Sequence, residues 1–297
     1  MKKFLSVICC ICVLNVMQAK KDVDEIIVEV TKSYAATDQS VLDLDVSFAQ
    51  VSVTAAAVNE IKVVMTASNI KADNSRCKSA VVEHFNKATN ASGNTVSVNV
   101  DGVFDQCKER NSCNISVWVE ITIPLKASIT GDASFTNVNL GAMQGAAKLH
   151  VDYGNIDSKG LWAYDNDLKV EFGNLKISGT NGGNFEAEYG NVEIGQIQGS
   201  AIVDVEFGNV EVKHVMTQCT HLNVKVAYGN VDLNLDPSAG YAFEVKSAYG
   251  NIDLDGDFKV NFSEKDYTEV FKKGTVGNGS GKLYVKAEFG NIDIDRK

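Results

Sequence analysis

The feature that most constrains this chain is a short motif, aromatic–Gly–Asn, that recurs after residue 150. Its intact copies are Tyr153-Gly154-Asn155, Phe172-Gly173-Asn174, Tyr189-Gly190-Asn191, Phe207-Gly208-Asn209, Tyr228-Gly229-Asn230, Tyr249-Gly250-Asn251 and Phe289-Gly290-Asn291. A degenerate copy begins at Phe135, and successive aromatic residues are 18, 19, 17, 18, 21, 21 and 40 positions apart. The last interval is a double one, so we expect a coil near residues 258–275 that has lost the motif. A repeat of this regularity predicts one structural unit per copy.

Apolar residues alternate on both sides of the motif. They stand four and two positions before the aromatic residue, as Val203 and Val205 do, and three and five positions after it, as Val210 and Val212 do. Alternate residues of a strand share a face, so the pattern places the aromatic residue on the same inward face as the apolar residues before it. After Gly–Asn the inward residues fall at odd instead of even distances from the aromatic residue, so the strand cannot continue straight through the motif. Glycine adopts positive φ freely and asparagine tolerates it, which suits a corner or bulge. We interpret Gly–Asn as the bend between two β-faces.

These observations predict an all-β fold, with residues 131–297 forming a single-chain, parallel β-helix-like β-solenoid of 17–21 residues per coil. Hairpins are the rival local interpretation, although the order that favours tight hairpins is Asn-Gly rather than Gly-Asn. A propeller is a second rival, but its blades run to about 40 residues. Stacked coils would align the motif into aromatic and Asn columns, and each aromatic pair would contribute about 0.5–1.5 kcal/mol beyond burial. A structural role therefore explains the motif without a ligand.

Residues 20–130 are expected to form an N-terminal β region. The runs 26–30 and 117–123 are strand-like, and the pattern favours no amphipathic helix. Leu44, Val46, Phe48, Val51 and Val53 reproduce the spacing of the repeat without Gly–Asn. This suggests that the first solenoid coils begin near residue 42, with residues 60–115 as a hairpin-rich excursion.

The first 19 residues have the pattern of a secretory signal peptide. Two lysines precede the apolar run 4–16, and Ala19 precedes the return of charge at Lys20. The run is shorter than the ~20 apolar residues that span a bilayer as a helix. We therefore expect export to the periplasm, the cell surface or the medium, with no transmembrane segment in the mature chain. Lipidation at one of the cysteines in this run is the alternative.

The net charge limits the kinds of partner that the chain can bind, and the cysteines limit which disulfides it can form. After residue 130 there are 24 acidic against 15 basic residues, which argues against binding nucleic acid through bulk charge. Cys107 and Cys113 flank a polar, turn-like stretch, and an oxidising compartment would permit a disulfide between them at the neck of a hairpin. The alternative is that they are small buried hydrophobic residues. Cys219 has no obvious partner.

Acidic residues recur beside the motif in two columns. One lies directly before the aromatic residue, and the other lies four positions after it and includes Glu193, Glu211, Asp232 and Asp253. Paired carboxylates suit Ca²⁺, so these four are the candidate metal ligands. The alternative is a solvated surface whose repulsion is offset by lysines on the adjacent column. No coil has a singular carboxylate cluster of the kind that polysaccharide-active enzymes use, and no catalytic residue or cofactor is expected.

The sequence 123–126, Ile-Pro-Leu-Lys, leads into coils that repeat aromatic-Gly-Asn-Ile/Val-Asp/Glu. This arrangement resembles the bacterial putative-adhesin family, which comprises exported β-solenoid domains of unknown function related to autotransporter adhesin head domains. The resemblance covers about residues 40–297, although the family's corner is often Gly-Asp. The family has no agreed catalytic residues to carry over. The resemblance implies a non-enzymatic cell-envelope or surface protein that binds an envelope glycan or a surface protein, or acts as a scaffold. The alternatives are a polysaccharide-active enzyme and a Ca²⁺-stabilised surface protein.

Overall fold

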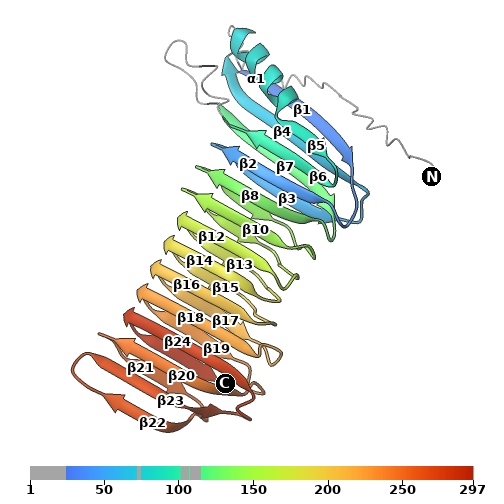
Figure 1. Ribbon diagram of the computed structural model, residues 1–297. Coiled ribbons are helices and arrows are strands. Elements are labelled where there is room, and N and C mark those ends of the chain that lie inside the picture. Colours follow the sequence, from blue (N-terminus) through green and yellow to red (C-terminus); the bar gives the residue numbers. More distant parts are fainter. Residues whose placement is uncertain (1–24, 72–74, 102–106, 108–114, 297) are drawn as a thin grey trace, which may run out of the picture. The chain divides into compact units, whose positions relative to one another are not determined.

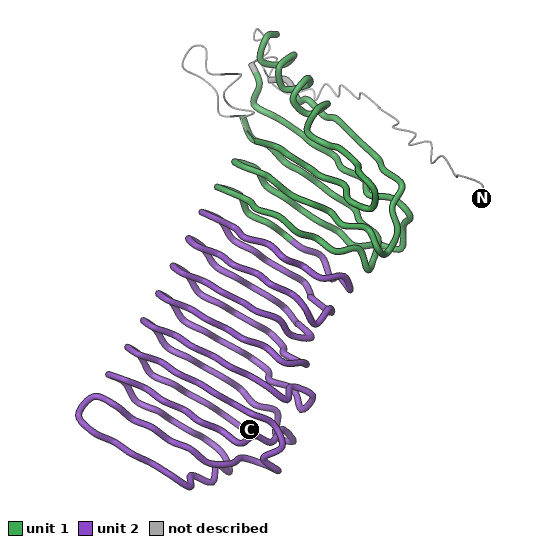
Figure 2. Tube along the Cα trace, viewed as in Figure 1, with its two compact units in different colours: residues 1–139 green, residues 140–297 purple. Residues whose placement is uncertain are grey.

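The computed structural model describes residues 25–71, 75–101, 107 and 115–296. It divides into two compact units, Met1–Asn139 and Leu140–Lys297 (Figure 2), and each is described by itself. The expected signal peptide, residues 1–19, lies outside the described residues. The expected domain boundary after residue 130 stays a prediction.

Unit 2 is a stack of coils, each with a longer strand in one sheet and a shorter strand in a second sheet (Figure 1). The long-strand sheet has the order β10 (Ala147–Asp152), β12 (Asn166–Phe172), β14 (Gly183–Tyr189), β16 (Ala201–Phe207), β18 (His221–Tyr228), β24 (Gly281–Phe289), β20 (Tyr241–Ala248), β23 (Glu269–Val276), β22 (Lys259–Lys265). The short-strand sheet has the order β11 (Ile156–Ser158), β13 (Leu175–Ile177), β15 (Val192–Ile194), β17 (Val210–Val215), β19 (Val231–Leu235), β25 (Ile292–Arg296), β21 (Ile252–Asp255). The all-β solenoid class is confirmed.

Parallel pairing places equivalent residues of successive coils beside one another. Val203 pairs with Val224, and Val210 pairs with Val231. The aliphatic residues that the alternation predicts to be inward are buried between the two sheets; Val203, Val205 and Val212 have no exposed surface. A third buried column runs through isolated parallel bridges at Met143, Leu161, Thr180, Ile197 and Val215. The core is therefore a stack of aliphatic layers, which the period-two pattern of each coil specifies.

The coil of β24 and β25 lies out of sequence order. β24 pairs in parallel with both β18 and β20, and β25 pairs in parallel with both β19 and β21. Residues 281–296 are therefore inserted between two coils that precede them in the chain. The segment 258–275, expected as a coil without the motif, instead forms an antiparallel hairpin of β22 and β23 that extends the sheet from β20. This hairpin explains the double interval in the repeat.

Unit 1 combines two such sheets with a helix. One sheet has the order β1 (Glu25–Ala35), β4 (Glu60–Lys71), β7 (Ser116–Pro124), β3 (Gln50–Ala56), β9 (Asn137–Leu140), and the other has the order β8 (Ser128–Ser134), β2 (Val41–Ser47), β6 (Thr95–Val100), β5 (Thr89–Ser92). β2 pairs in parallel with β8, and Phe48 stacks on Phe135 with ring centroids 4.7 Å apart. β2 and β8 therefore stack in parallel as the coils of unit 2 do, and the start of the solenoid near residue 42 stays a prediction.

Two expectations for unit 1 are wrong. Residues 75–87 form helix α1 (Ser75–Lys87), which packs on β1 and β4 and buries Cys77, Val81 and Phe85 at four-residue spacing. Cys77 forms a disulfide with Cys107, with Cα atoms 5.0 Å apart. The expected Cys107–Cys113 link is therefore replaced by a link from the helix, and Cys113 lies outside the described residues. Only one residue per helical turn is buried, and Val82 beside Val81 blurs the helical period, so the pattern did not stand out in a β-rich chain.

Candidate binding surface

The motif aromatics of unit 2 form an exposed ladder rather than part of the core. In spatial order the rings of this aromatic ladder are Tyr153, Phe172, Tyr189, Phe207, Tyr228, Phe289 and Tyr249. Neighbouring centroids lie 4.6–4.9 Å apart, and the ring planes are within 6° of parallel. Exposed fractions run from 37% at Phe207 to 63% at Tyr249. The inward placement inferred from the alternation is therefore wrong.

The backbone turns at the motif itself, which directs the rings outward. Tyr153 and Tyr249 adopt φ values of 55° and 53°. At Phe172, Phe207 and Tyr228 the following glycine takes a positive φ of 152–156° instead. At these five corners the extended backbone that the alternation assumes ends at the aromatic residue or at the glycine that follows it. The insertion of β24 and β25 also makes Tyr and Phe alternate strictly along the ladder, which they do not do in the sequence.

The motif glycines are required by the close approach of neighbouring coils. A Cβ built on Gly190 would overlap the carbonyl oxygen of Gly173, and each later copy meets the glycine carbonyl of the adjacent coil in the same way. Because both groups belong to backbones held by parallel pairing, neither can move aside alone. Any larger residue would separate two coils.

The motif asparagines form an exposed hydrogen-bonded column, the Asn ladder. Its members are Asn155, Asn174, Asn191, Asn209, Asn230, Asn291 and Asn251. In each step the Oδ1 of one Asn accepts the backbone N–H of the next, over 2.8–3.0 Å. Four steps add an amide bond of 3.1–3.3 Å between side chains. Motif glycine and asparagine thus serve coil stacking.

The four candidate metal ligands lie in one file on the outward face of the short-strand sheet. Parallel register gives the order Glu193, Glu211, Asp232, Asp293, Asp253. Asp293 therefore separates Asp232 from Asp253. Within the described residues, no group of three or more His, Cys, Asp or Glu side chains is arranged to hold a metal ion. A calcium role for these carboxylates stays a prediction.

The ends of this acidic file differ electrostatically. The pKa of Glu193 is lowered, chiefly because the Lys213 ammonium donates a hydrogen bond to it and Lys176 lies 3.2 Å away. The pKa of Asp232 is raised, first by burial and then by the neighbouring charges of Glu211 and Asp295. The file therefore passes from a region neutralised by lysine to one of mutual carboxylate repulsion.

The acidic column on the long-strand sheet is largely compensated by lysines of the next column. Lys169 Nζ lies 2.8 Å from Glu188 and 3.6 Å from Glu171. Lys286 Nζ lies 2.7 Å from Glu288. The hydrogen bond to Glu188 is the main reason that the pKa of Lys169 is raised. This column behaves as a screened surface, the alternative that the sequence left open.

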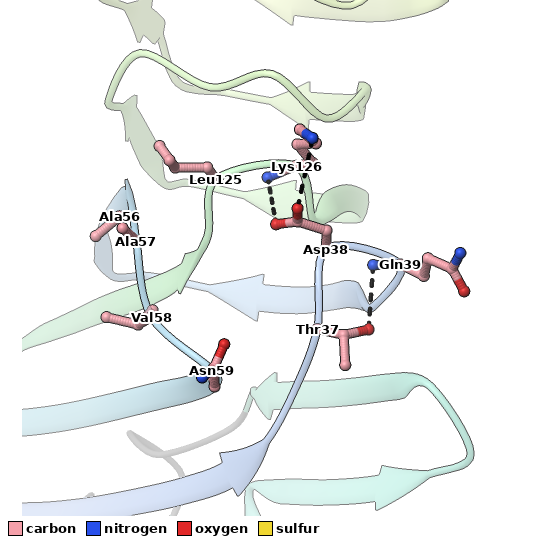
Figure 3. Close-up of a pocket in the computed structure, with 9 residues that line it drawn as sticks. All are labelled: Thr37, Asp38, Gln39, Ala56, Ala57, Val58, Asn59, Leu125 and Lys126. Carbon is pink, nitrogen blue, oxygen red and sulfur yellow. Dashed lines mark hydrogen bonds and ion pairs between the residues drawn. The ribbon is translucent and has the colours of Figure 1, made fainter.

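A wide depression in unit 1 is formed by three loops (Figure 3). Its volume is ≈ 730 Å³, and it is lined by Thr37, Asp38, Gln39, Ala56, Ala57, Val58, Asn59, Leu125 and Lys126. The two charged residues of this lining neutralise one another. Lys126 Nζ lies 3.7 Å from Asp38 Oδ2, and the Lys126 backbone N–H donates to Asp38 Oδ1 over 3.3 Å. This loop depression offers no general base beside a nucleophile.

A second cavity, which the sequence did not indicate, lies on the long-strand sheet where β24 is inserted. This β24 cavity has a volume of ≈ 380 Å³, and its outward-facing lining is His221, Asn223, Ala242, Glu244, Lys273, Lys282 and Tyr284. Asn223 is in register with Tyr284, Tyr284 with Glu244, and Glu244 with Lys273. These residues come together only through the insertion, so no spacing in the sequence could have revealed them.

The chain is similar to one family model and to several solved structures. A family model described as Toastrack DUF4097 matches residues 10–295. A putative adhesin from Bacteroides fragilis is 14% identical, with 93% of this chain and 98% of that chain covered and a TM-score of 0.35. A putative adhesin from Parabacteroides merdae is 12% identical, with 91% of this chain and 96% of that chain covered and a TM-score of 0.38. A putative lipid binding protein from Parabacteroides distasonis is also 12% identical, with 91% of this chain and 96% of that chain covered and a TM-score of 0.31.

No curated protein matches the chain. Among the described residues, no helix has the length and apolar character needed to cross a membrane.

Proposed function

This chain belongs to the Toastrack DUF4097 family, and we propose that it is an exported, non-enzymatic protein of the cell envelope that binds a partner in the manner of an adhesin. The binding surface is the acidic file of the short-strand sheet, in the order Glu193, Glu211, Asp232, Asp293, Asp253. A scaffolding role would use the same surface.

The observation that carries this proposal is that the carboxylates repeat from coil to coil and point the same way. Glycoside hydrolysis needs two carboxyl groups that flank one bond from opposite sides, with pKa values driven apart. Asp232 and Asp293 instead stand side by side on one outward face, about 4.8 Å apart as parallel strands dictate. A file of this kind can contact an extended partner at many points, which favours binding over catalysis.

The negative charge of this surface supports a partner that is neutral or positively charged. Formal net charge is −10, and Asp232 carries a raised pKa among like charges. A cationic or neutral polyhydroxylated partner would relieve this repulsion, whereas an anionic membrane or nucleic acid would add to it. Export is supported by the pattern of residues 1–19.

The test is a binding screen of the purified full chain against envelope glycans and surface proteins. The Asp232→Asn/Asp253→Asn double variant removes two charges from the acidic file. Asp167→Asn/Asp204→Asn removes the same charge from exposed positions of the long-strand sheet and serves as the matched control. Loss of binding in the first variant alone is expected. Equal loss in both would reduce the effect to net charge, and release of new reducing ends from a bound glycan would favour the enzyme alternative.

A further inference from the structure

We propose that the β24 cavity binds an acidic sugar, a pyranose that carries a carboxylate, within an extended glycan. This site is separate from the acidic file, because it lies on the other sheet of unit 2. It goes beyond the proposed function by adding a second surface of opposite charge and a defined ligand class.

The cavity is a local exception to the repeat. Its central column, Asn223, Tyr284, Glu244 and Lys273, spans four neighbouring strands. In the preceding coils, the same column holds Lys148, Asp167, Asn184 and Ile202, none of which is aromatic. The small side chain of Ala242, between Lys282 and Thr275 in register, leaves room beside Tyr284. A volume of ≈ 380 Å³ is at the lower end of the ~300–1,000 Å³ range of small-ligand sites.

Positive charge gathers around this cavity in an otherwise acidic protein. Three acids of the region are already paired: Glu244 with Lys273, Glu269 with Lys246, and Glu288 with Lys286. Lys282 in the lining and Lys225 in the next column have no ion-pair partner among the residues the structure describes. His221 lines the same wall and is exposed. The region therefore carries an excess of cations that an anionic ligand would complement.

The remaining lining groups favour a sugar over a bare anion. Tyr284 is 36% exposed, and in the described structure it stacks on no other ring, in contrast to the aromatic ladder. Its ring can lie against the C–H face of a pyranose. Asn223 Oδ1 is buried without a hydrogen-bond partner in the described part of the chain, and Glu244 is a further acceptor. Two acceptors suit the several hydroxyl donors of a sugar, which a bare phosphate dianion lacks.

The groups of the cavity thus have distinct tasks. The Lys282 ammonium would pair with the sugar carboxylate, and the Tyr284 ring would support the pyranose. Asn223 and Glu244 would accept hydrogen bonds from its hydroxyl groups. The carboxylate contact is charge-assisted and supplies the discrimination between acidic and neutral sugars.

The experiment uses the full chain and isothermal titration with trigalacturonate, its fully methyl-esterified form and inorganic phosphate. We expect the acid to bind at least about tenfold more tightly than the ester, the loss that follows from removing one charge-assisted bond. Lys282→Gln should lower the affinity for the acid to that for the ester and leave the ester unchanged. Tyr284→Ala should weaken both, and Lys213→Gln on the other sheet is the matched control.

Each alternative outcome overturns the proposal. Equal affinities for acid and ester would refute the role of Lys282. Displacement of the sugar by phosphate at comparable concentration would assign the cavity to a phosphate group. An unchanged affinity in Tyr284→Ala, with the thermal midpoint showing that the variant is folded, would exclude the ring. Binding that survives Asp232→Asn/Asp253→Asn separates this site from the acidic file, so either proposal can fail without the other.

Discussion

Replacing Asn191 by alanine isolates the contribution of the Asn ladder to stability. Asn191 Oδ1 accepts the backbone N–H of Asn209 over 2.9 Å and its Nδ2–H over 3.1 Å, while Asn191 Nδ2 donates to Asn174 Oδ1 over 3.1 Å. The substitution removes these three bonds and leaves the backbone N–H of residue 191 bonded to Asn174.

The magnitude follows from the position of these bonds. Each hydrogen bond contributes about 0.5–1.5 kcal/mol net, and exposed bonds lie in the lower half of that range, so we expect a loss of about 1.5–3 kcal/mol. For a domain of this size, 1 kcal/mol corresponds to about 2–4 °C in the thermal midpoint, which gives a decrease of about 3–12 °C.

Two control variants also replace an asparagine by alanine, but at positions that make fewer side-chain hydrogen bonds. Asn184 is exposed on β14, and its side chain makes no hydrogen bond within the described structure. Asn251 ends the ladder: its backbone N–H donates to Asn291, and no further Asn follows. Asn184→Ala should shift the midpoint little, and Asn251→Ala should cost less than Asn191→Ala. The assay is thermal melting combined with hydrogen exchange of the Asn209 amide, which should lose protection in Asn191→Ala. Equal shifts in all three variants, or unchanged Asn209 protection, would refute the ladder as a source of stability.

Further predictions concern the close approach of coils, the acidic file, the disulfide and calcium. Gly190→Ala should destabilise unit 2 more than Asn191→Ala does, as measured by urea denaturation, because its Cβ meets backbone that cannot relax. The raised pKa of Asp232 means that ionisation opposes folding, so stability rises as pH falls through the folded-state pKa. Asp232→Asn should therefore melt higher than wild type at pH 7, and the difference should vanish below the ordinary value of 3.8. Cys77→Ser opens a link between residues 30 positions apart, which costs unit 1 about 3.6 kcal/mol by loop entropy; peptide mapping without reductant should recover Cys77 joined to Cys107. Millimolar calcium should leave the thermal midpoint unchanged, and a rise would restore the Ca²⁺-stabilised alternative.

The buried layers of unit 2 were predictable because the information is local. Val203, Val205, Val210 and Val212 occupy one coil, and their spacing alone assigns them to the inward face. The direction of the neighbouring Phe207 ring was not predictable in this way, because parity assumes an extended backbone up to the glycine. The backbone instead turns within the motif, at the aromatic residue in the Tyr153 and Tyr249 coils and at the glycine beside Phe207.

The features that the sequence could not indicate depend on contacts between residues far apart in the chain. The order of the β24 coil relative to the β20 coil leaves no trace in the repeat, since every copy of the motif fits beside every other. The Cys77–Cys107 link depends on a helix that buries only one residue per turn. The β24 cavity was not predictable for the same reason, because only the insertion of β24 brings Tyr284 beside Asn223 and Glu244.

The insertion of β24 and β25 also dictates when unit 2 can become complete. A stack in chain order could add each coil to a finished surface as the polypeptide emerges from a ribosome or a translocon. Here the coil that contains Tyr249 can pair with β23 on one side, but the edges that β24 and β25 will occupy have no permanent neighbour until residues 281–296 arrive. Until then these edges are unpaired or pair provisionally with the Tyr228 coil. Completion then requires that any such provisional register be opened and the late coil admitted. The slowest step in the assembly of this solenoid is therefore expected at this end of the stack, where a holding factor or a kinetic trap would act.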